Sequence, residues 1–332
     1  MEKKLAIIIP TYNESQFIVN TLKGILSQDS DDYVVYIVDD CSKDDTVSLI
    51  HQHYANEISS GKIDLAVLSE NSGSAVARQH ALSRVTTKFV SFVDADDSFA
   101  SNHAISAMCN AVDAVDADVY MFSYFTNHGS IRLKKSPRLP KMMTSREALI
   151  RKVNGGHPVW HYLWNKIYRM SVIRAQDVVF RPALRRAEDV RFNDDFLIKA
   201  RNVCYFDTPL YVYNCTNPKS VSARKASTTF GRDQFLAKWQ RLCERYDRLL
   251  SNATILGCAN ECEMRLRRNL CSNMISSLNK LDSASIRKSV EQSISSSAQY
   301  EAIRPFIRRE RIRYFFKSSE RKLRDTVKKI MS

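Results

Sequence analysis

The segment LAIIIPTYNESQFIVNTLKGILSQDSDDYVVYIV, residues 5–38, contains an apolar run, a segment with helical periodicity and a second apolar run. Runs of this kind, bounded by polar residues, are typical of a β-strand, an α-helix and another β-strand. A strand, helix, strand order of this length favours two parallel strands joined by a right-handed crossover. We therefore expect a βαβ unit here.

The same alternation continues to about residue 93, with helix-like segments at 46–58 and 74–85 between strand-like segments at 63–69 and 88–93. The pattern predicts an α/β fold with a mainly parallel sheet. Ligands of such sheets bind outside the carboxyl ends of the strands, so the residues after each apolar run are the candidates for a site. They are Pro10-Thr11-Tyr12-Asn13-Glu14, Asp39-Asp40-Cys41-Ser42, Asn71-Ser72-Gly73-Ser74 and Asp94-Ala95-Asp96-Asp97.

Three aspartates follow the last of these strands, where FVSFVDADDSFA ends an apolar run with Asp94, Asp96 and Asp97. Carboxylates so close repel one another and resist ionisation unless a cation or several hydrogen-bond donors lie among them. A divalent metal ion meets that need. The alternative is an acidic turn in which Asp97 or Ser98 caps a helix that begins near Asn102. These residues alone leave both interpretations open.

The composition is that of a soluble globular protein. The 332 residues are 44% hydrophobic and 26% charged, which suggests about two domains with a sizeable core. No stretch approaches the ~20 apolar residues of a membrane-spanning helix, and the first apolar run is too short for a signal peptide. We therefore expect a cytoplasmic protein. Eight cysteines without a C-x-x-C pair or regular spacing predict reduced thiols.

The net charge of +14, from 50 basic and 36 acidic residues, favours an acidic partner such as nucleic acid, anionic lipid headgroups or phosphate-bearing small molecules. Neither G-x-G-x-x-G nor a P-loop pattern follows the first apolar run. Phosphates must therefore be held by other groups, and a metal ion at the aspartate cluster would serve.

The pattern changes after a further strand-like segment at 116–125 and a hairpin-like segment at 126–135, so we place a boundary near Pro140. The following residues mix aromatic and charged side chains, as the wall of a cleft for a polar ligand does. A helical pattern with little Gly or Pro then begins at about Thr228. We expect one α/β domain over 1–225, with halves 1–125 and about 140–225, and a helical, basic region over 226–332.

The end of this helical region combines basic residues with aromatic and aliphatic ones, which fits an anionic membrane surface. One alternative is a solvated basic helix. We expect no nucleic-acid binding, because no such motif accompanies the charge. Apolar stripes such as FLAKWQRLCERYDRLL could also pair between subunits, so an oligomer is possible. The residues concerned are Arg304, Arg308, Arg309, Arg311, Arg313, Lys317, Arg321, Lys322, Arg324, Lys328 and Lys329 beside Phe306, Ile307, Ile312, Tyr314, Phe315 and Phe316.

Four motifs occur in order along the chain: IIIPTYNE, VDDCSKDDT, NSGSAVARQHAL and the D-x-D element within FVDADD. Together they resemble the family 2 glycosyltransferases, which have the Rossmann-like GT-A fold, strongly over about residues 3–125 and more loosely over 155–225. The resemblance implies an inverting enzyme that moves one sugar from a nucleotide-sugar, typically a UDP-sugar, to a lipid-linked or oligosaccharide acceptor. The enzyme would act in capsule, O-antigen or cell-wall polysaccharide synthesis. The resemblance also implies Mn²⁺ or Mg²⁺ at the aspartate cluster, where the ion would bridge the two phosphates of the donor and neutralise the leaving diphosphate.

The resemblance places the nucleotide against the first strand ends. Asp40, with Asp39 as the competing choice, would hydrogen-bond the uracil ring. Glu14 would orient the first loop. The base pocket would be lined by Pro10, Thr11 and Tyr12.

The same resemblance gives roles to the aspartate cluster and to the third loop. Asp94 or Asp96, on either side of Ala95, would contact the ribose, and Asp96 or Asp97 would ligate the metal. The family segment that lies along the donor matches Asn71, Gly73 and Arg78. Arg78 could therefore bind the donor with its guanidinium. The alternative is that Arg78 only lies on the surface of its helix.

RRAEDVRF resembles the place of the acceptor-side base, which would make Asp189 the general base and Glu188 a neighbour that contacts the acceptor. Such a base contributes roughly 10²- to 10⁴-fold in rate. Alternatively, the pair are first-turn acids that favour the helix dipole, and Asp194 and Asp195 are then the reserve candidates for the base. WNKIYR resembles a segment that places Trp164 and Asn165 near the sugar and Lys166 at the diphosphate.

The sequence departs from the family at Cys41, where Gly is usual. The Q-x-x-R-W signature of processive synthases is missing, which favours transfer of a single residue. His157 and His161 are four apart, but Pro158 places His157 at or before a helix start and so off the shared face. We therefore leave both histidines out of the metal site.

The leading hypothesis is thus a metal-dependent glycosyltransferase, cytoplasmic and peripheral on the inner face of the membrane. A nucleotidyltransferase could share the α/β plan, but the basic Gly-rich loop of those enzymes is absent. A non-catalytic, membrane-peripheral assembly protein is the third possibility, and the intact clusters at all four strand ends speak against it.

Overall fold

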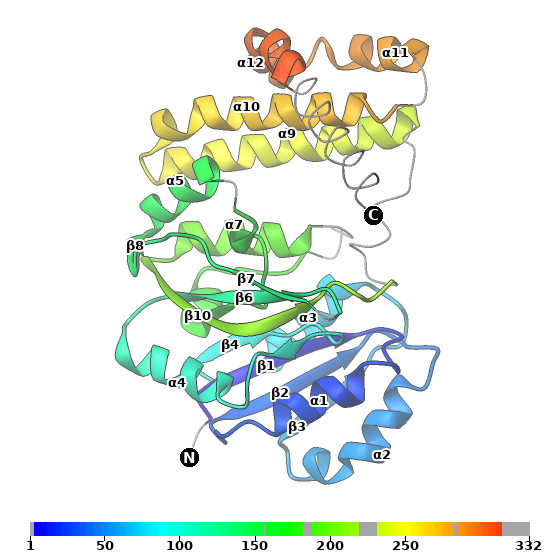
Figure 1. Cartoon of the computed structure of the whole chain (residues 1–332), viewed down its shortest axis with the longest axis vertical. Coiled ribbons are helices and arrows are strands. Elements are labelled where there is room, and N and C mark those ends of the chain that lie inside the picture. Colours follow the sequence, from blue (N-terminus) through cyan, green and yellow to red (C-terminus); the bar gives the residue numbers. More distant parts are fainter. Residues whose placement is uncertain are drawn as a thin grey trace. The chain divides into compact units, whose positions relative to one another are not determined.

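The computed structural model describes residues 3–129, 131–155, 157–181, 187–218, 231–281 and 284–313. The chain divides into two compact units, of which the first comprises residues 1–152 and 156–223 and the second 153–155 and 224–332 (Figure 1). The predicted basic and aromatic cluster from Tyr314 onward lies outside the described residues.

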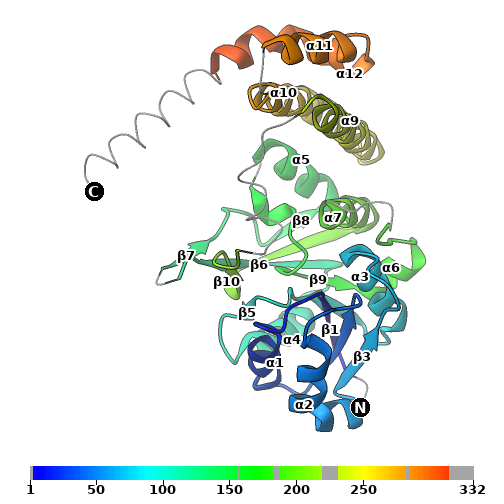
Figure 2. The ribbon, with the colours of Figure 1, turned by 90° about the vertical axis from the view of Figure 1, so that its right-hand side faces the viewer.

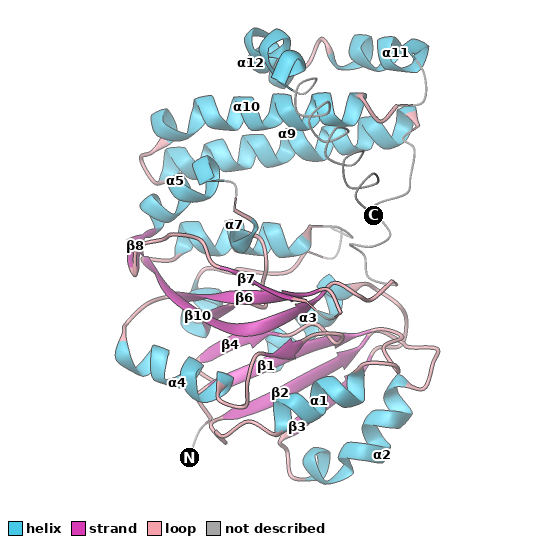
Figure 3. Ribbon diagram, in the orientation of Figure 1, coloured by secondary structure: helices cyan, strands magenta, loops and turns pink. Residues whose placement is uncertain are grey.

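The first unit is built on one mixed sheet (Figure 3). Its described strands follow the order β3-β2-β1-β4-β9-β6-β10-β5, with β7 on β6 and β8 on β10. The neighbours β3, β2, β1 and β4 are all parallel, which confirms the predicted βαβ rhythm and parallel sheet. The strands are β1 Leu5–Thr11, β2 Tyr33–Asp39, β3 Ile63–Val67, β4 Phe89–Phe92, β5 Ser98–Phe99, β6 Val119–Asn127, β7 Arg132–Lys135, β8 Met142–Thr144, β9 Lys166–Arg169 and β10 Asn202–Asn214.

The apolar runs form strands because helices cover both faces of the sheet. Ile7 and Ile8 of β1 are fully buried, as expected for a parallel strand between two helical layers. Helix α1 (Ile18–Leu26) lies on one side of β1 and α3 (Ser74–Arg84) on the other (Figure 2). The remaining helices of this half are α2 Thr46–Ser59 and α4 Ala104–Ala114.

The second half of the sheet brings distant segments together. Strand β9 pairs antiparallel with both β4 and β6, and β10 runs parallel to β6. The predicted hairpin exists, since β7 pairs antiparallel with β6. His157 precedes the short helix η1 (Pro158–Trp160), as the proline predicted, and its side chain accepts a hydrogen bond from the Val159 amide. The other helices here are α5 Ser145–Gly155, α6 Met170–Ala175 and α7 Glu188–Lys199.

Helix α7 is anchored through its middle by aromatic packing. The Phe192 ring stacks on Phe180 at 4.3 Å between centroids and meets Phe92 of β4 edge to face at 5.8 Å. Tyr168 of β9 lies edge-on to Phe192 at 5.4 Å, and its hydroxyl donates to Asn193 Oδ1. Because these rings are buried, the helix has a fixed position on the sheet.

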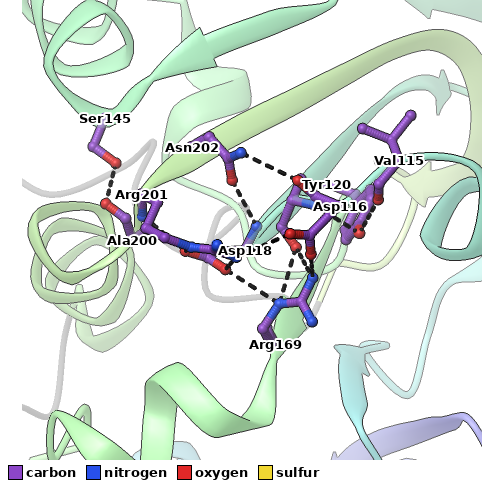
Figure 4. A network of polar contacts seen from close by, with 10 residues as sticks. Val115, Asp116, Asp118, Tyr120, Ser145, Arg169, Ala200, Arg201 and Asn202 are labelled. Carbon is purple, nitrogen blue, oxygen red and sulfur yellow. Dashed lines mark hydrogen bonds and ion pairs between the residues drawn. The ribbon is translucent and has the colours of Figure 1, made fainter.

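A polar network fixes the carboxyl end of α7 (Figure 4). The Asp118 carboxylate accepts hydrogen bonds from the Arg201 backbone amide at 2.8 Å and from the Arg201 guanidinium. Arg169 Nε of β9 lies 3.1 Å from the same carboxylate. Ser145 Oγ donates to the carbonyl of Ala200, the residue that follows the helix. The end of α7 is thereby tied to the starts of β6 and β10.

The described part of the second unit is helical: α9 Arg232–Ile255, α10 Ala259–Leu278, α11 Ala284–Ile294, α12 Ala298–Ile303 and η2 Arg304–Phe306. Helices α9 and α10 pack side by side (Figure 1). Phe235, Trp239 and Tyr246 of the apolar stripe on α9 are buried within the chain itself, so the stripe does not require a second subunit. All eight cysteines are free thiols, as predicted. Among the described residues, no helix is both long and apolar enough to cross a membrane.

Candidate functional site

The first two strand ends meet through backbone and side-chain hydrogen bonds. Thr11 of β1 stands opposite Asp39 of β2, and its hydroxyl donates to Asp39 Oδ2 at 3.0 Å. The Asn13 amide donates to Ser42 Oγ at 2.8 Å. Two of these loop residues, Asn13 (φ 57°) and Cys41 (φ 62°), have left-handed backbone conformations, which a glycine adopts with less strain.

The two candidate base-binding aspartates have different partners. Asp39 is fully buried, and its carboxylate accepts from Thr11, from the Ser42 amide at 2.7 Å and from Ser42 Oγ at 2.5 Å. Asp40 accepts from the Ser72 and Gly73 amides at 2.8 and 2.7 Å. Asp39 has no exposed surface and Asp40 retains 3%, and both oxygens of each carboxylate accept from protein donors, so the choice of Asp40 as the residue that binds a base stays a prediction.

The other predicted pocket residues line the same edge of the sheet. Tyr12 is 41% exposed, so its ring is available to stack on a base, whereas Pro10 is only partly exposed. The Glu14 carbonyl accepts from the Phe17 and Ile18 amides, and the Glu14 amide donates to Thr46 Oγ1, so this residue joins the first loop to α1 and α2. Asn71 Nδ2 donates to the Asp40 carbonyl at 3.4 Å. These contacts bring together the predicted nucleotide-binding residues of three loops.

The aspartate cluster after β4 separates into three environments. Both carboxylate oxygens of Asp97 point into the protein, where Oδ1 accepts from the Asn214 amide and Oδ2 from the Tyr211 hydroxyl, each at 2.7 Å. Asp96 Oδ2 accepts from Asn217 at 2.7 Å, and Asp94 Oδ1 from Arg78 at 3.0 Å.

These environments bear on two predictions. Asp97 is 3% exposed and both of its oxygens accept from protein donors, which favours Asp96 over Asp97 as the candidate metal ligand of the cluster. The N-cap alternative is wrong, because α4 begins at Ala104 after His103 and neither Asp97 nor Ser98 caps it. Ala95, which lies between, is buried, and its carbonyl accepts from Thr21 at 2.8 Å. It can therefore shape the site only through its backbone.

The donor set fits a hard divalent cation that shares its ligands with a substrate. No three His, Cys, Asp or Glu side chains converge to hold a metal within the part of the chain that the structure describes. Mg²⁺ and similar ions, however, are often held by one or two carboxylates together with substrate phosphates. Burial and the neighbouring charge of Asp94 raise the pKa of Asp96, although the Asn217 hydrogen bond opposes them. Asp96 with a diphosphate would therefore suit Mn²⁺ or Mg²⁺.

The candidate base is at the amino end of α7. Asp189 and Glu188 form the first turn after Ala187, which has a left-handed conformation (φ 61°). Burial, and then the charge of Glu188, raise the pKa of Asp189. Burial alone would raise the pKa of Glu188 as well, but the charge of Arg78 and the hydrogen bond from Ser74 outweigh it and lower that pKa.

The pKa of Asp189 is thus raised and that of Glu188 lowered. Opposite shifts of this kind let one carboxyl group act as a base while its neighbour stays ionised. The reserve candidates on the same helix are occupied. Asp194 is buried against the Lys152 ammonium, and Asp195 pairs with Arg191 at 2.7 Å.

The predicted sugar-side residues Trp164, Asn165 and Lys166 are buried, which argues against their contact with the donor. The Lys166 ammonium donates to the carbonyls of Val159 and Tyr162 and to Asn165 Oδ1, and burial followed by the charge of Lys152 lowers its pKa well below the ordinary value. A lysine so enclosed does not reach a diphosphate. The Trp164 ring lies between those of Tyr162 and Tyr211, at 4.4 and 4.5 Å between centroids.

Sequence reasoning missed the contribution of β10 and of the residues that follow it. Tyr211, Asn214 and Asn217 hold the aspartate cluster from more than a hundred positions away. No local pattern marks these residues. The only available signal was a run of tyrosine and asparagine in YVYNCTN, residues 211–217.

Comparison with known proteins gives a consistent result. A family model described as Glycosyl transferase family 2 matches residues 6–174. The poly(ribitol-phosphate) beta-N-acetylglucosaminyltransferase TarS of Staphylococcus aureus is 26% identical over 213 residues, which are 63% of this chain and 35% of that protein. The uncharacterized glycosyltransferase EpsJ of Bacillus subtilis is 23% identical over 311 residues, 92% of this chain and 86% of that protein. This chain therefore spans only about a third of the length of TarS.

The crystal structure of S. aureus TarS 1-349 in complex with UDP-GlcNAc has a TM-score of 0.64 to this chain at 19% identity, covering 95% of this chain and 92% of that one. The likeness confirms the fold predicted from the sequence, a GT-A-like α/β architecture with a mainly parallel central sheet.

Proposed function

Because the chain belongs to glycosyl transferase family 2, whose model matches residues 6–174, we propose that it moves one sugar from a UDP-sugar to a hydroxyl group of a surface polysaccharide or its lipid-linked precursor. The observation that carries the proposal is a direct contact between the donor side and the acceptor side of the site. Arg78 bridges Asp94, in the loop after β4, to Glu188, which precedes Asp189 in α7. A donor at the aspartate loop and an acceptor at Asp189 would therefore meet.

The donor side would be held by the strand-end loops. The exposed ring of Tyr12 would stack on the base, and Asp40 would accept from it. Asp96 would be the protein ligand of a divalent cation that also binds the diphosphate. When bound, such a cation neutralises charge that develops on the leaving diphosphate.

The acceptor side would be served by Asp189 as general base. Its carboxylate would take the proton of the acceptor hydroxyl as the oxygen forms a bond to the anomeric carbon and the bond from that carbon to UDP breaks. A pKa raised by burial makes this carboxylate a stronger base than an ordinary aspartate. We propose a single displacement, with inversion at the anomeric carbon.

The relatives support this substrate class. TarS is named as an N-acetylglucosaminyltransferase for poly(ribitol phosphate), and its crystal structure holds UDP-GlcNAc. UDP-GlcNAc is therefore the first donor to test. Family membership also favours glycosyl transfer over the nucleotidyltransferase and the non-catalytic assembly protein that the sequence left open.

The test compares two aspartates of the same helix. UDP release from UDP-GlcNAc in the presence of Mn²⁺ is measured for the wild type, Asp189→Asn and the control Asp195→Asn, which loses only a pair with Arg191. We expect Asp189→Asn to lose about 10²-fold or more of kcat, while UDP still raises its melting temperature. Wild-type rates in Asp189→Asn would rule out the proposed base.

We also propose that the second unit places the enzyme on the anionic inner face of the membrane. Residues 224–332 contain 24 basic and 11 acidic side chains, whereas residues 1–223 contain 26 and 25, so nearly all the net charge belongs to the second unit. Within its described part, basic and apolar side chains alternate along one segment, where Arg304, Ile307, Arg308, Arg311 and Ile312 line a shared hollow. Basic residues beside apolar ones suit an anionic interface.

Flotation of the full chain with phosphatidylglycerol or phosphatidylcholine vesicles tests this proposal. We expect binding to the anionic vesicles alone, lost when Arg304, Arg308 and Arg309 are all changed to glutamine. Equal binding of this triple variant and the wild type would contradict the role of these residues.

A further inference from the structure

The side chain of Arg78 joins three elements of the first unit. It extends from the middle of α3, is 10% exposed, and donates from Nη1 to Glu188 Oε1 at 2.9 Å and from Nη2 to Asp94 Oδ1 at 3.0 Å. Ser74, one turn earlier on α3, donates to the same Glu188 oxygen at 2.6 Å. Asp40 in turn accepts from the amides that precede α3. The loops after β2 and β4 and the first turn of α7 are thus connected through one helix.

We propose that Arg78 is a positioning residue, which binds Glu188 and Asp94 at once and so leaves Asp189 as the one first-turn carboxylate that faces the acceptor. The sequence suggested other roles, with Arg78 along the donor and Glu188 on the acceptor. The inference deepens the proposed function and rests on it, because it concerns the same base.

The energetics argue against a purely stabilising role for this cluster. Moving the Arg78 guanidinium and the Glu188 carboxylate largely out of water costs several kcal/mol per ion in practice, and buried ion pairs often contribute no more stability than apolar residues of the same volume. Arg78 Nε is moreover a buried donor without a hydrogen-bond partner among the described residues. What the cluster does provide is geometry, since a planar guanidinium fixes the direction of each carboxylate it binds.

Because the charges around Asp189 shift its pKa, titration of this carboxyl group reports on the arrangement of its neighbours. Glu188, Arg78 and Asp94 act on the carboxylate of Asp189, while Tyr162, Lys166 and Tyr168 face it from the neighbouring segments. The charge of Glu188 raises the pKa of Asp189, and that of Arg78 lowers it. Removing the charge of Glu188 must therefore lower the pKa of Asp189, and removing that of Arg78 must raise it.

The experiment is a carbon-13 titration of aspartate carboxyl groups in the full chain, with the Asp189 signal assigned by its loss in Asp189→Asn. The variants are Arg78→Met, Arg78→Lys, Glu188→Gln and the double variant Arg78→Met/Glu188→Gln. The control is Arg84→Met, which removes a partly exposed guanidinium of the same helix that pairs with Asp64. Melting temperatures and UDP release from UDP-GlcNAc are measured for each.

We expect Arg78→Met to raise the pKa of Asp189 and Glu188→Gln to lower it. The double variant should lie near the wild type, Arg78→Lys between wild type and Arg78→Met, and Arg84→Met should show no shift. In activity, Arg78→Met should lower kcat while KM for UDP-GlcNAc stays within about twofold, because it alters the base rather than donor binding.

Two results would overturn the inference. One is an unchanged Asp189 titration in both Arg78→Met and Glu188→Gln. The other is a KM for UDP-GlcNAc raised tenfold or more in Arg78→Met with kcat unchanged, which would make Arg78 a donor ligand. Failure of the proposed function is separate, since it would be seen as full activity in Asp189→Asn whatever the titrations give.

Discussion

Replacing Asp118 with asparagine should destabilise the first unit by about 2 kcal/mol. The Asp118 side chain is 1% exposed and accepts from the Arg201 amide at 2.8 Å and from two guanidinium nitrogens of Arg201 at 3.1 and 2.9 Å, with Arg169 Nε also 3.1 Å away (Figure 4). Asparagine keeps one acceptor oxygen and no charge. A hydrogen bond to a charged group contributes about 1.5–3 kcal/mol, and at least one is lost outright. Arg201 is 64% exposed, so its freed guanidinium returns to water, which limits the cost.

Asp116 offers a matched control, because it pairs with the same two arginines but is 70% exposed. Exposed ion pairs contribute about 0–1 kcal/mol, so Asp116→Asn should have little effect. The assay is urea unfolding followed by tryptophan fluorescence in a Trp239→Phe background, which leaves Trp160 and Trp164 as reporters of the first unit. With a slope of about 3 kcal/mol per M, a loss of about 2 kcal/mol lowers the midpoint by roughly 0.7 M.

The pH dependence adds an independent check. Burial opposes ionisation of Asp118, but the hydrogen bonds and charge of Arg201 outweigh it and lower the pKa of this carboxyl in the folded state. A lowered folded pKa stabilises above the unfolded pKa, and that contribution is lost as the pH falls through the folded value. The difference between wild type and Asp118→Asn should therefore be constant above about pH 5 and shrink below about pH 4. Equal midpoints for the Asp118 and Asp116 variants at neutral pH would refute the reasoning.

Three further predictions concern the site. Asp96→Ala should abolish the Mn²⁺-dependent rise in melting temperature caused by UDP, whereas Asp97→Asn should instead lower the melting temperature without ligand, since one of the two oxygens that accept from Tyr211 and Asn214 is replaced by an amide donor. Lys166→Met should lower the melting temperature, because the carbonyls of Val159 and Tyr162 and the side-chain oxygen of Asn165 each lose one donor, with KM for UDP-GlcNAc unchanged within about twofold; a large rise in KM would instead indicate that Lys166 contacts the diphosphate. Cys41→Gly should raise stability by about 0.5–1 kcal/mol in urea unfolding, because φ is 62° at this position, and no gain would indicate that the Cys41 contacts offset the strain.

Much of the first unit could be predicted because its signals are local. The alternation of apolar runs with helical periodicity indicated β1 to β4 and the helices between them, and Pro158 indicated where η1 begins. Parallel neighbouring strands then require their carboxyl-end loops to share an edge. The candidate loops for a nucleotide-sugar were therefore accessible from one sequence. The same holds for α7, whose acidic first turn and apolar spacing are visible in EDVRFNDDFLIK, residues 188–199.

The functions of single side chains within those loops were not accessible in this way. WNKIYR resembles a ligand-binding segment in sequence. In the structure, however, β9 pairs with β4 and β6, which buries Lys166 against carbonyls of the preceding residues. Arg78 looked like a helix-surface or donor residue because its partners, Asp94 and Glu188, are 16 and 110 positions away. Pairing over such separations depends on how the elements pack, which no local periodicity encodes.

The sequence by itself determined the order of strands and helices, the family and the edge of the sheet at which we expect a ligand to bind, since hydrophobic periodicity and short motifs are properties of neighbouring residues. Only the tertiary structure decided which aspartate of the cluster is available to a cation. Asp96 and Asp97 are adjacent and chemically identical, and what distinguishes them is that Tyr211 and Asn214, more than a hundred residues later, turn both oxygens of Asp97 inward. A carboxylate acts as a ligand or as a structural acceptor according to the donors that the fold places beside it, and those donors come from β10.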